Sequence, residues 1–318
     1  MGSDIDEAYW RCAPIFGLMR DLGEDSTYVL QRLMEVCRPR TALQFCKFDL
    51  EKTDDRLLFE MLQHFLQGEE PDGPQPKSWD IEKALERLEQ SNHIKKAELI
   101  QLEFALFPVL HYAGEARAEA LFEAVTTDPL VFAELVSLVF NPEHGNREET
   151  ITDALKNAAN NAYDILHACR RQPGARADGS IDSDAYIQFI EAAREQCRQA
   201  DRLPWGEYTL GEIIAHAPPD EDGTWPFEPA RRVLEQHDLK EMRRGFYFGA
   251  INNRGVTCRS PCDGGDQERE LVAYYRNQAQ KVQHDQPHVA ELMESLARNY
   301  EHDALREDNA ANLRKEGF

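Results

Sequence analysis

Arginines and glycines gather in one segment of this chain, where together they could hold an anion. Between Met242 and Cys262 there is no acidic residue, although acids outnumber bases 58 to 36 in the whole sequence. Guanidinium groups pair with phosphates and carboxylates, and glycines let backbone N–H groups approach such a ligand. The candidate residues for binding an anionic ligand or an acidic partner are therefore Arg243, Arg244, Arg254, Gly255, Arg259, Gly264 and Gly265.

A structural interpretation of the same residues stays open. In it, the arginines pair with acidic helices around them and the glycines allow close packing. The segment does not match a Walker A loop, which needs Gly-Lys-Ser/Thr, or a dinucleotide fingerprint that follows a strand. A domain or enzyme that holds a nucleotide or another phosphate ligand in the 242–266 loop is the main alternative to a binding site for a protein.

The stretch RADGSIDSDAYIQFIEAA begins like the second half of a calcium-binding EF-hand. Aligning Gly179 with the turn glycine of that loop places Asp178 and Asp182 at ligand positions. Arg176 and Ala185 then stand where oxygen ligands are required, the second of them in place of the bidentate glutamate. The stretch therefore predicts an Asp-Gly turn followed by a helix N-cap, and no calcium site.

Other metal and cofactor sites find little support. Cys258 and Cys262 have a spacing that zinc ligands use, and so do His284 and His288. Pro287, however, interrupts the helix that would align the two histidines, and the chain has no CxxC pair. No metal site, no cofactor and no catalytic residue is expected.

The formal net charge of -22 excludes general binding to nucleic acids, because most of the surface repels phosphates. It leaves room for an acidic protein that mimics DNA, a less favoured alternative. The sequence contains no apolar run of membrane-spanning length and no signal peptide, and its seven cysteines do not form a disulfide framework. A cytoplasmic protein without a membrane partner is the expectation.

Helical periodicity runs through almost the whole chain. Val29, Leu30 and Leu33 lie on one face of a helix, and Leu58, Met61 and Leu62 repeat the pattern. Asp128 before Pro129 predicts a helix start. Alternation typical of strands is almost absent, and only the segment 245–251 has a composition in which a short strand competes. The prediction is an all-α fold, either a helical bundle or a short α-solenoid of stacked hairpins.

Polar breaks divide this helical pattern into two expected subdomains. The break NPEHGNREE (141–149) places an N-terminal helical subdomain at residues 1–145 and a C-terminal one at residues 146–318. The C-terminal subdomain contains the Gly/Arg loop and ends in a long helical hairpin, whose first arm ends at Val282 and whose second arm begins at Pro287. A second Asp-Gly turn at Asp222 is compatible with a helical repeat of about 40 to 47 residues.

Several short sequences in this half are distinctive together. They are GEIIAHAP (211–218), DGTWP (222–226), RGVT (254–257) and GGDQEREL (264–271). Through them, residues from about 164 to the end resemble the C-terminal helical segment of large, mostly uncharacterised bacterial multidomain proteins. The resemblance implies an accessory segment with no established activity. Phage defence is one function that the resemblance suggests for the larger protein.

Together these observations favour a non-enzymatic helical module of a larger bacterial protein. Its expected partner is another protein or another domain of the same chain. The helical periodicity, the absence of catalytic signatures and the isolated arginine segment motivate this hypothesis.

Overall fold

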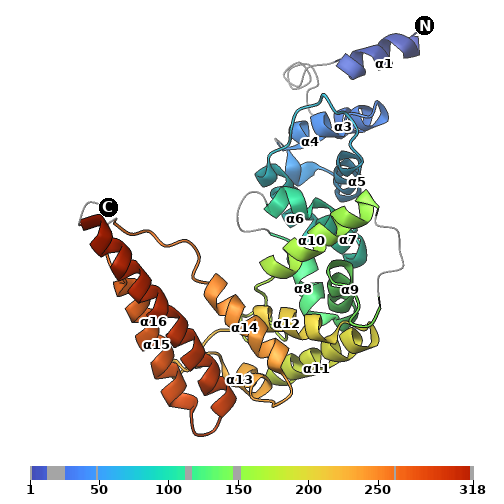
Figure 1. Cartoon of the computed structure of the whole chain (residues 1–318). Helices are drawn as coiled ribbons and strands as arrows, with labels where there is room; N and C mark the ends of the chain where they lie inside the picture. Colours follow the sequence, from blue (N-terminus) through green and yellow to red (C-terminus); the bar gives the residue numbers. More distant parts are fainter. Residues whose placement is uncertain are drawn as a thin grey trace. The chain divides into compact units, whose positions relative to one another are not determined.

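The computed structural model describes residues 2–12, 26–47, 49–111, 117–145, 152–260 and 263–315. Within these ranges the chain forms α-helices and one 3-10 helix but no strand, so the predicted all-α fold is confirmed (Figure 1). The segment 245–251 is helical as well. No helix in the described ranges combines the length and the apolar character needed to cross a membrane.

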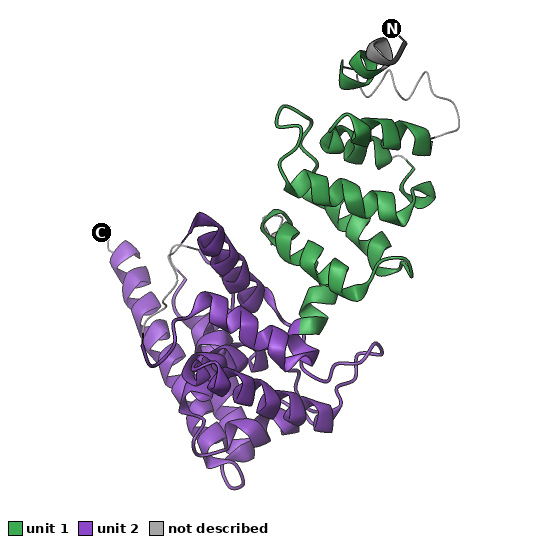
Figure 2. Ribbon diagram, turned by 90° about the vertical axis from the view of Figure 1, so that its right-hand side faces the viewer, with its two compact units in different colours: residues 1–124 green, residues 125–318 purple. Residues whose placement is uncertain are grey.

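The chain divides into two compact units, residues 1–124 and residues 125–318 (Figure 2). The helices that begin before the division are α1 (Gly2–Cys12), α3 (Ser26–Glu35), α4 (Pro39–Cys46), η1 (Leu50–Lys52), α5 (Asp55–Leu66), α6 (Ser78–Glu89), α7 (Lys96–His111) and α8 (Glu119–Thr127), the last of which extends across it. Those after it are α9 (Pro129–Val139), α10 (Asp153–Ala168), α11 (Ser183–Gln199), α12 (Leu203–Ile214), α13 (Glu228–Leu234), α14 (Lys240–Asn252), α15 (Asp266–Val282) and α16 (Pro287–Lys315).

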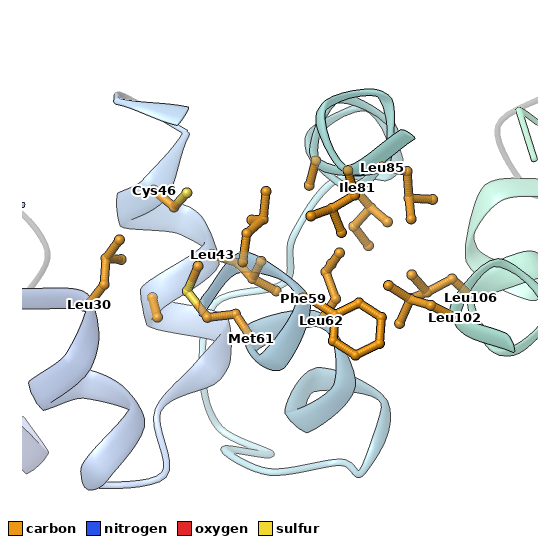
Figure 3. Close-up of a cluster of buried hydrophobic side chains, with 14 of the residues drawn as sticks. Leu30, Leu43, Cys46, Phe59, Met61, Leu62, Ile81, Leu85, Leu102 and Leu106 are labelled. Carbon is orange, nitrogen blue, oxygen red and sulfur yellow. The ribbon is translucent and has the colours of Figure 1, made fainter. Parts of the chain in front are cut away.

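In the first unit, consecutive helices from α3 to α7 pack on one another, a pattern that fits a bundle or a solenoid. Their apolar faces meet in one core (Figure 3). Leu30, Leu58 and Met61, which helical periodicity placed on buried faces, are fully buried there. The core continues through Ile81 and Leu102, so side chains from successive helices share one interior.

The division between the units lies before the break at 141–149 that the sequence marks. Helix α9 packs on α10 and α11, with the rings of Phe132 and Phe189 at 6.3 Å. Phe140, just after α9, stacks on Trp205 at 4.6 Å, and its carbonyl oxygen accepts a hydrogen bond from Arg202 at 3.1 Å. Residues 125–145 therefore belong with the C-terminal unit, because α9 buries its apolar face against the helices that follow it.

Helix boundaries follow the local signals closely. The Asp128 side chain accepts a hydrogen bond from the Leu130 N–H at the start of α9, as predicted. Asp182 accepts from the N–H groups of Asp184 and Ala185, which confirms the N-cap reading of the EF-hand-like stretch. The turn at Asp222 also forms, but α13 begins only at Glu228 and has no side-chain N-cap. The terminal hairpin has the predicted bounds, with α15 ending at Val282 and α16 beginning at Pro287.

Helices α12 and α14 cross at backbone contact, and glycine makes this approach possible. A Cβ atom on Gly245 would lie 1.8 Å from the Tyr208 carbonyl oxygen, and one on Gly211 would lie 2.0 Å from the Met242 carbonyl oxygen. Neither position has room for a side chain, because both obstructing atoms belong to helical backbone. The crossing fixes which face of α14 is buried and which face points outward.

We predict that Gly245→Ala lowers the free energy of unfolding by about 3 kcal/mol or more, since the methyl group forces the two helix backbones apart. Gly255→Ala is the matched control. Gly255 has a φ of +65° but open space around its Cβ position, so only the backbone strain of about 1 kcal/mol applies. Urea denaturation of both variants measures the difference. Equal losses of stability would contradict the close crossing.

One buried carboxyl group makes the first unit sensitive to pH. Glu103 of α7 is fully buried, and its Oε2 accepts a hydrogen bond of 2.7 Å from the Leu121 N–H near the start of α8. Burial raises the pKa of Glu103 to about 8, although the Leu121 N–H opposes this shift, and the nearby Glu89 carboxylate adds to it. The folded chain therefore keeps a proton on Glu103 at neutral pH.

This proton predicts how stability changes with pH. Between about pH 4.5 and pH 8 the unfolded chain has released the proton that folded Glu103 retains, so the free energy of unfolding falls as the pH rises through this window. Glu103→Gln removes the titration and keeps a neutral side chain of the same shape. The variant should match the wild type near pH 5 and exceed its stability at about pH 8 by about 3–4 kcal/mol. Chemical denaturation of both proteins at the two pH values tests this. A difference in stability between variant and wild type that is the same at both pH values would contradict it.

Candidate functional site

The arginine and glycine residues singled out in the sequence separate into two groups in the structure. Arg254 and Arg259 both bind the carboxylate of Glu268, a residue in the first turn of α15. The Glu268 side chain is 1% exposed, and those of the two arginines are 19% and 17% exposed. Arg259 also contacts Glu307 of α16 at 3.2 Å. Two cations therefore meet two carboxylates in a largely buried network.

The pKa of Glu268 shows how strongly the two arginines stabilise its carboxylate. Burial works to raise the pKa of Glu268, but hydrogen bonds from Arg259 and Arg254 outweigh it and hold the pKa at about 2. The Arg254 guanidinium also lies over the Tyr300 ring, 5.4 Å from its centre. Both arginines thus attach the 253–265 loop to the terminal hairpin, and their charge is already matched by protein carboxylates.

The glycines of this loop have structural roles. Gly265 lies against the backbone of α16, where a Cβ atom would come within 2.4 Å of Ala304, and its N–H donates to Asp308 at 2.8 Å. A Cβ atom on Gly264 would meet the Asp308 carboxylate. Gly255 adopts a left-handed φ of +65° in the exposed turn after α14. Close packing and a tight turn account for these three positions.

Arg243 and Arg244 lie elsewhere, on the outer face of α14. Arg243 donates to the carbonyl oxygens of Leu234 at 2.8 Å and Gln236 at 2.6 Å, and so caps the C-terminal end of α13. Arg244 is 63% exposed, pairs with Glu241 one turn earlier at 3.3 Å, and lies over the ring of Tyr208. Carbonyl oxygens do not neutralise a guanidinium, and an exposed ion pair is screened by solvent. These two arginines keep their charge at the surface.

A groove with a volume of about 530 Å³ opens beside them, between α14 and α16. Its cationic and histidine side chains are Lys240, Arg243, Arg244, His237 and His288. The rings of His237 and His288 lie 5.5 Å apart. The groove is therefore rich in cations although the chain as a whole carries a net charge of -22.

Apolar and aromatic side chains complete the groove. Tyr247, Phe248 and Leu292 line it, and Phe248 is 40% exposed although it is a large hydrophobic residue. Glu291 of α16 supplies an acidic group on the opposite wall. Aromatic residues and arginine are enriched at the centres of protein interfaces, whereas a polar rim surrounds them.

The wall formed by α16 is held by a carboxylate from α13. Glu235, at the end of α13, accepts hydrogen bonds from the N–H groups of His288 and Val289 at 3.0 and 3.1 Å. This carboxylate meets N–H groups that the first turn of a helix leaves unpaired, and the helix dipole favours its charge. The end of α13 thus positions both walls, since Arg243 of α14 also binds there.

No sequence motif marks His237, Lys240 or Phe248 as a site residue, and His288 stands out only as one of two histidines at a spacing that zinc ligands use. One signal was present in the sequence: Lys240, Arg244 and Phe248 recur at the spacing of one helical turn. The segment 245–251 was, however, considered as a competing strand, and this spacing has meaning only on a helix. His237 lies between α13 and α14, whereas His288 lies in the first turn of α16, and only tertiary packing brings them together.

The metal ligands considered in the sequence do not converge in the described part of the chain. Cys258 is exposed on the loop and His288 lies in the groove, while Cys262 lies outside the described residues. The described residues contain one group of three candidate ligands, Glu143, His144 and Asp201. The Asp201 carboxylate already accepts hydrogen bonds from the backbone N–H of His144 and from its ring, both at 2.8 Å, so this exposed group is explained by its own pairing.

Comparison with known proteins finds no matching family model, no matching curated protein and no matching solved structure. The function therefore has to be argued from the residues and geometry of this chain.

The buried network around Glu268 makes a prediction about stability. Glu268→Gln leaves two buried arginines without their shared carboxylate, which should lower the free energy of unfolding at pH 7 by about 3–5 kcal/mol. Because the pKa of Glu268 is depressed to about 2 in the folded chain, its contribution is present above about pH 4.5 and is lost as the pH falls towards 2. The difference between wild type and variant should shrink over that range.

Chemical denaturation of both proteins between about pH 7 and pH 3 measures this effect. Glu301→Gln is the matched control, since Glu301 pairs with Arg276 at 2.7 Å on the surface, where both side chains are about half exposed. Its cost should be about 1 kcal/mol or less. If Glu268→Gln lost as little stability as the control, the ion pairs of Glu268 would not be what stabilises the loop.

Proposed function

We propose that this chain is a non-enzymatic helical interaction module that binds an acidic segment of another protein, or of another domain of a larger chain, in the groove between α14 and α16. The observation that carries the proposal is the concentration of Lys240, Arg243 and Arg244 around an open groove in a chain of net charge -22. In such a chain, a local positive potential attracts a negatively charged surface and orients its approach.

Aromatic exposure supports a protein as the partner. Phe248 is 40% exposed beside Tyr247 and Tyr208, with ring centres 5.4 and 6.4 Å away. A cluster of this kind provides apolar area that a partner side chain can cover, and Arg244 borders it. Interfaces gain most of their affinity from such aromatic and arginine anchors, while charge governs the rate and specificity of association.

The phosphate-ligand alternative receives no comparable support. It uses the whole 242–266 loop, and two of the four arginines there, Arg254 and Arg259, are held by Glu268 and Glu307. A phosphate would have to compete with a buried carboxylate for both cations. No observation in the described residues favours an acidic DNA mimic over an acidic surface that keeps the chain soluble.

The proposal includes the setting implied by the sequence. It assigns the module to a larger bacterial protein, as the resemblance of residues 164–318 implies, and to the cytoplasm, which is the expectation from the sequence, and it includes no cofactor. Phage defence belongs to the same proposal only through that resemblance.

Reversing the charge of the groove tests the proposal. We expect the wild type to bind a fluorescein-labelled, glutamate-rich peptide in fluorescence anisotropy, with an affinity that falls as salt is added. Lys240→Glu/Arg244→Glu should weaken this binding by about tenfold or more, because it places two acidic side chains against an acidic ligand. Both residues are exposed, so the melting temperature of the variant serves as the check on folding.

Lys52→Glu/Lys156→Glu is the control with the same change in net charge. Its two lysine side chains are 79% and 59% exposed and do not line the groove. Binding within about twofold of the wild type is expected for this control, since long-range charge is screened at physiological salt. Equal weakening in both variants would show non-specific charge attraction and would overturn the proposal. Competition by inorganic pyrophosphate but not by unlabelled peptide would favour the phosphate-ligand alternative instead.

A further inference from the structure

The outer face of α14 presents its groove residues in a regular row. Lys240, Arg244 and Phe248 are all exposed and follow one another at intervals of four residues. Residues at this spacing lie on one helix face, about 6 Å apart along the axis. The row therefore offers two cations and then an aromatic ring over a length of about 12 Å.

The opposite wall has the same helical spacing. His288, Glu291, Leu292 and Ser295 of α16 line the groove, and they too lie three or four residues apart. Both walls are thus formed by helices, α14 and α16 (Figure 1), whose side chains line the groove. Two neighbouring helix surfaces leave between them a trough, and helices pack into such troughs in helical bundles.

Backbone chemistry favours a helix over an extended segment in this trough. An extended peptide that binds as an added strand needs a sheet edge, and the described residues around the groove form no strand. A helical peptide satisfies its own backbone and presents only side chains to the walls. This binding mode is used where an amphipathic helix lies in a groove with anchors at helical spacing.

We infer that the occupant of the groove is an acidic amphipathic helix. Two of its carboxylates, one turn apart, face Lys240 and Arg244, and an apolar residue one turn further covers Phe248. On the side of α16, a basic residue of the occupant faces Glu291. This inference rests on the proposed function and adds to it the conformation and the side-chain register of the partner.

Designed peptides test the register directly. Two alanine-based helical peptides carry Glu, Glu and Leu at successive intervals of four residues, one in each order along the chain. A third peptide has the same composition with the two Glu and the Leu placed on different faces of the helix. In fluorescence anisotropy, the better of the two registered peptides should bind the wild type about tenfold more tightly than the third peptide.

Two variants locate the contacts. Phe248→Ala should weaken binding of the registered peptide by about fivefold, because only the registered helix places its leucine on that ring. Binding of the third peptide should stay within about twofold of its wild-type value. Lys240→Glu/Arg244→Glu should abolish the preference, and a registered peptide with Lys in place of both Glu residues should restore binding to this variant. Rescue by exchanged charges is not expected from a variant that has merely lost its fold.

The outcomes separate this inference from the proposed function. Equal binding of all three peptides, still weakened by Lys240→Glu/Arg244→Glu, would support an acidic partner and overturn the helical register. A preference for the registered peptide that Phe248→Ala does not change would also overturn it. No binding of any peptide to the wild type, including the flexible glutamate-rich peptide, would overturn both.

Discussion

The close crossing of α12 and α14 is the constraint on which the candidate site depends. Gly245 and Gly211 each face backbone atoms of the opposite helix, so the two helices share a contact that no side chain can enter. This contact buries Met242, Phe246 and Ala250 on the inner face of α14. Lys240, Arg244 and Phe248 are left on the outer face, where they line the groove. Packing on one side of a helix thereby determines the chemistry on the other.

Several arginines of this chain are held in buried ion pairs. Arg194 binds Glu207 through Nε and Nη2 at 3.0 and 2.8 Å, and Arg254 and Arg259 converge on Glu268. Each of these arginines is more than four-fifths buried. Removing one partner from such a pair is costly because the other charge stays buried. Lys240 and Arg244 of α14, by contrast, lie exposed at the surface.

The end of α13 connects these features into one site. Its last carbonyl oxygens accept the Arg243 guanidinium, and the Glu235 carboxylate accepts the first N–H groups of α16. A helix leaves N–H groups unpaired at its start and carbonyl oxygens unpaired at its end. Here the carbonyl oxygens at the end of α13 and the N–H groups at the start of α16 both find partners. The two walls of the groove are consequently positioned by the same short helix.

The sequence by itself determined the helices. Periodicity, the caps at Asp128 and Asp182 and the bounds at Val282 and Pro287 all act within a few residues, so local patterns are sufficient to predict them. The sequence also marked the arginines and left their two interpretations open. Only the tertiary structure shows which arginines are paired, because pairing depends on carboxylates distant in the chain, such as Glu307. The boundary between the units, the pairing of Arg254 and Arg259, and the meeting of His237 with His288 are long-range contacts. Local spacing carries no information about which helix faces will meet.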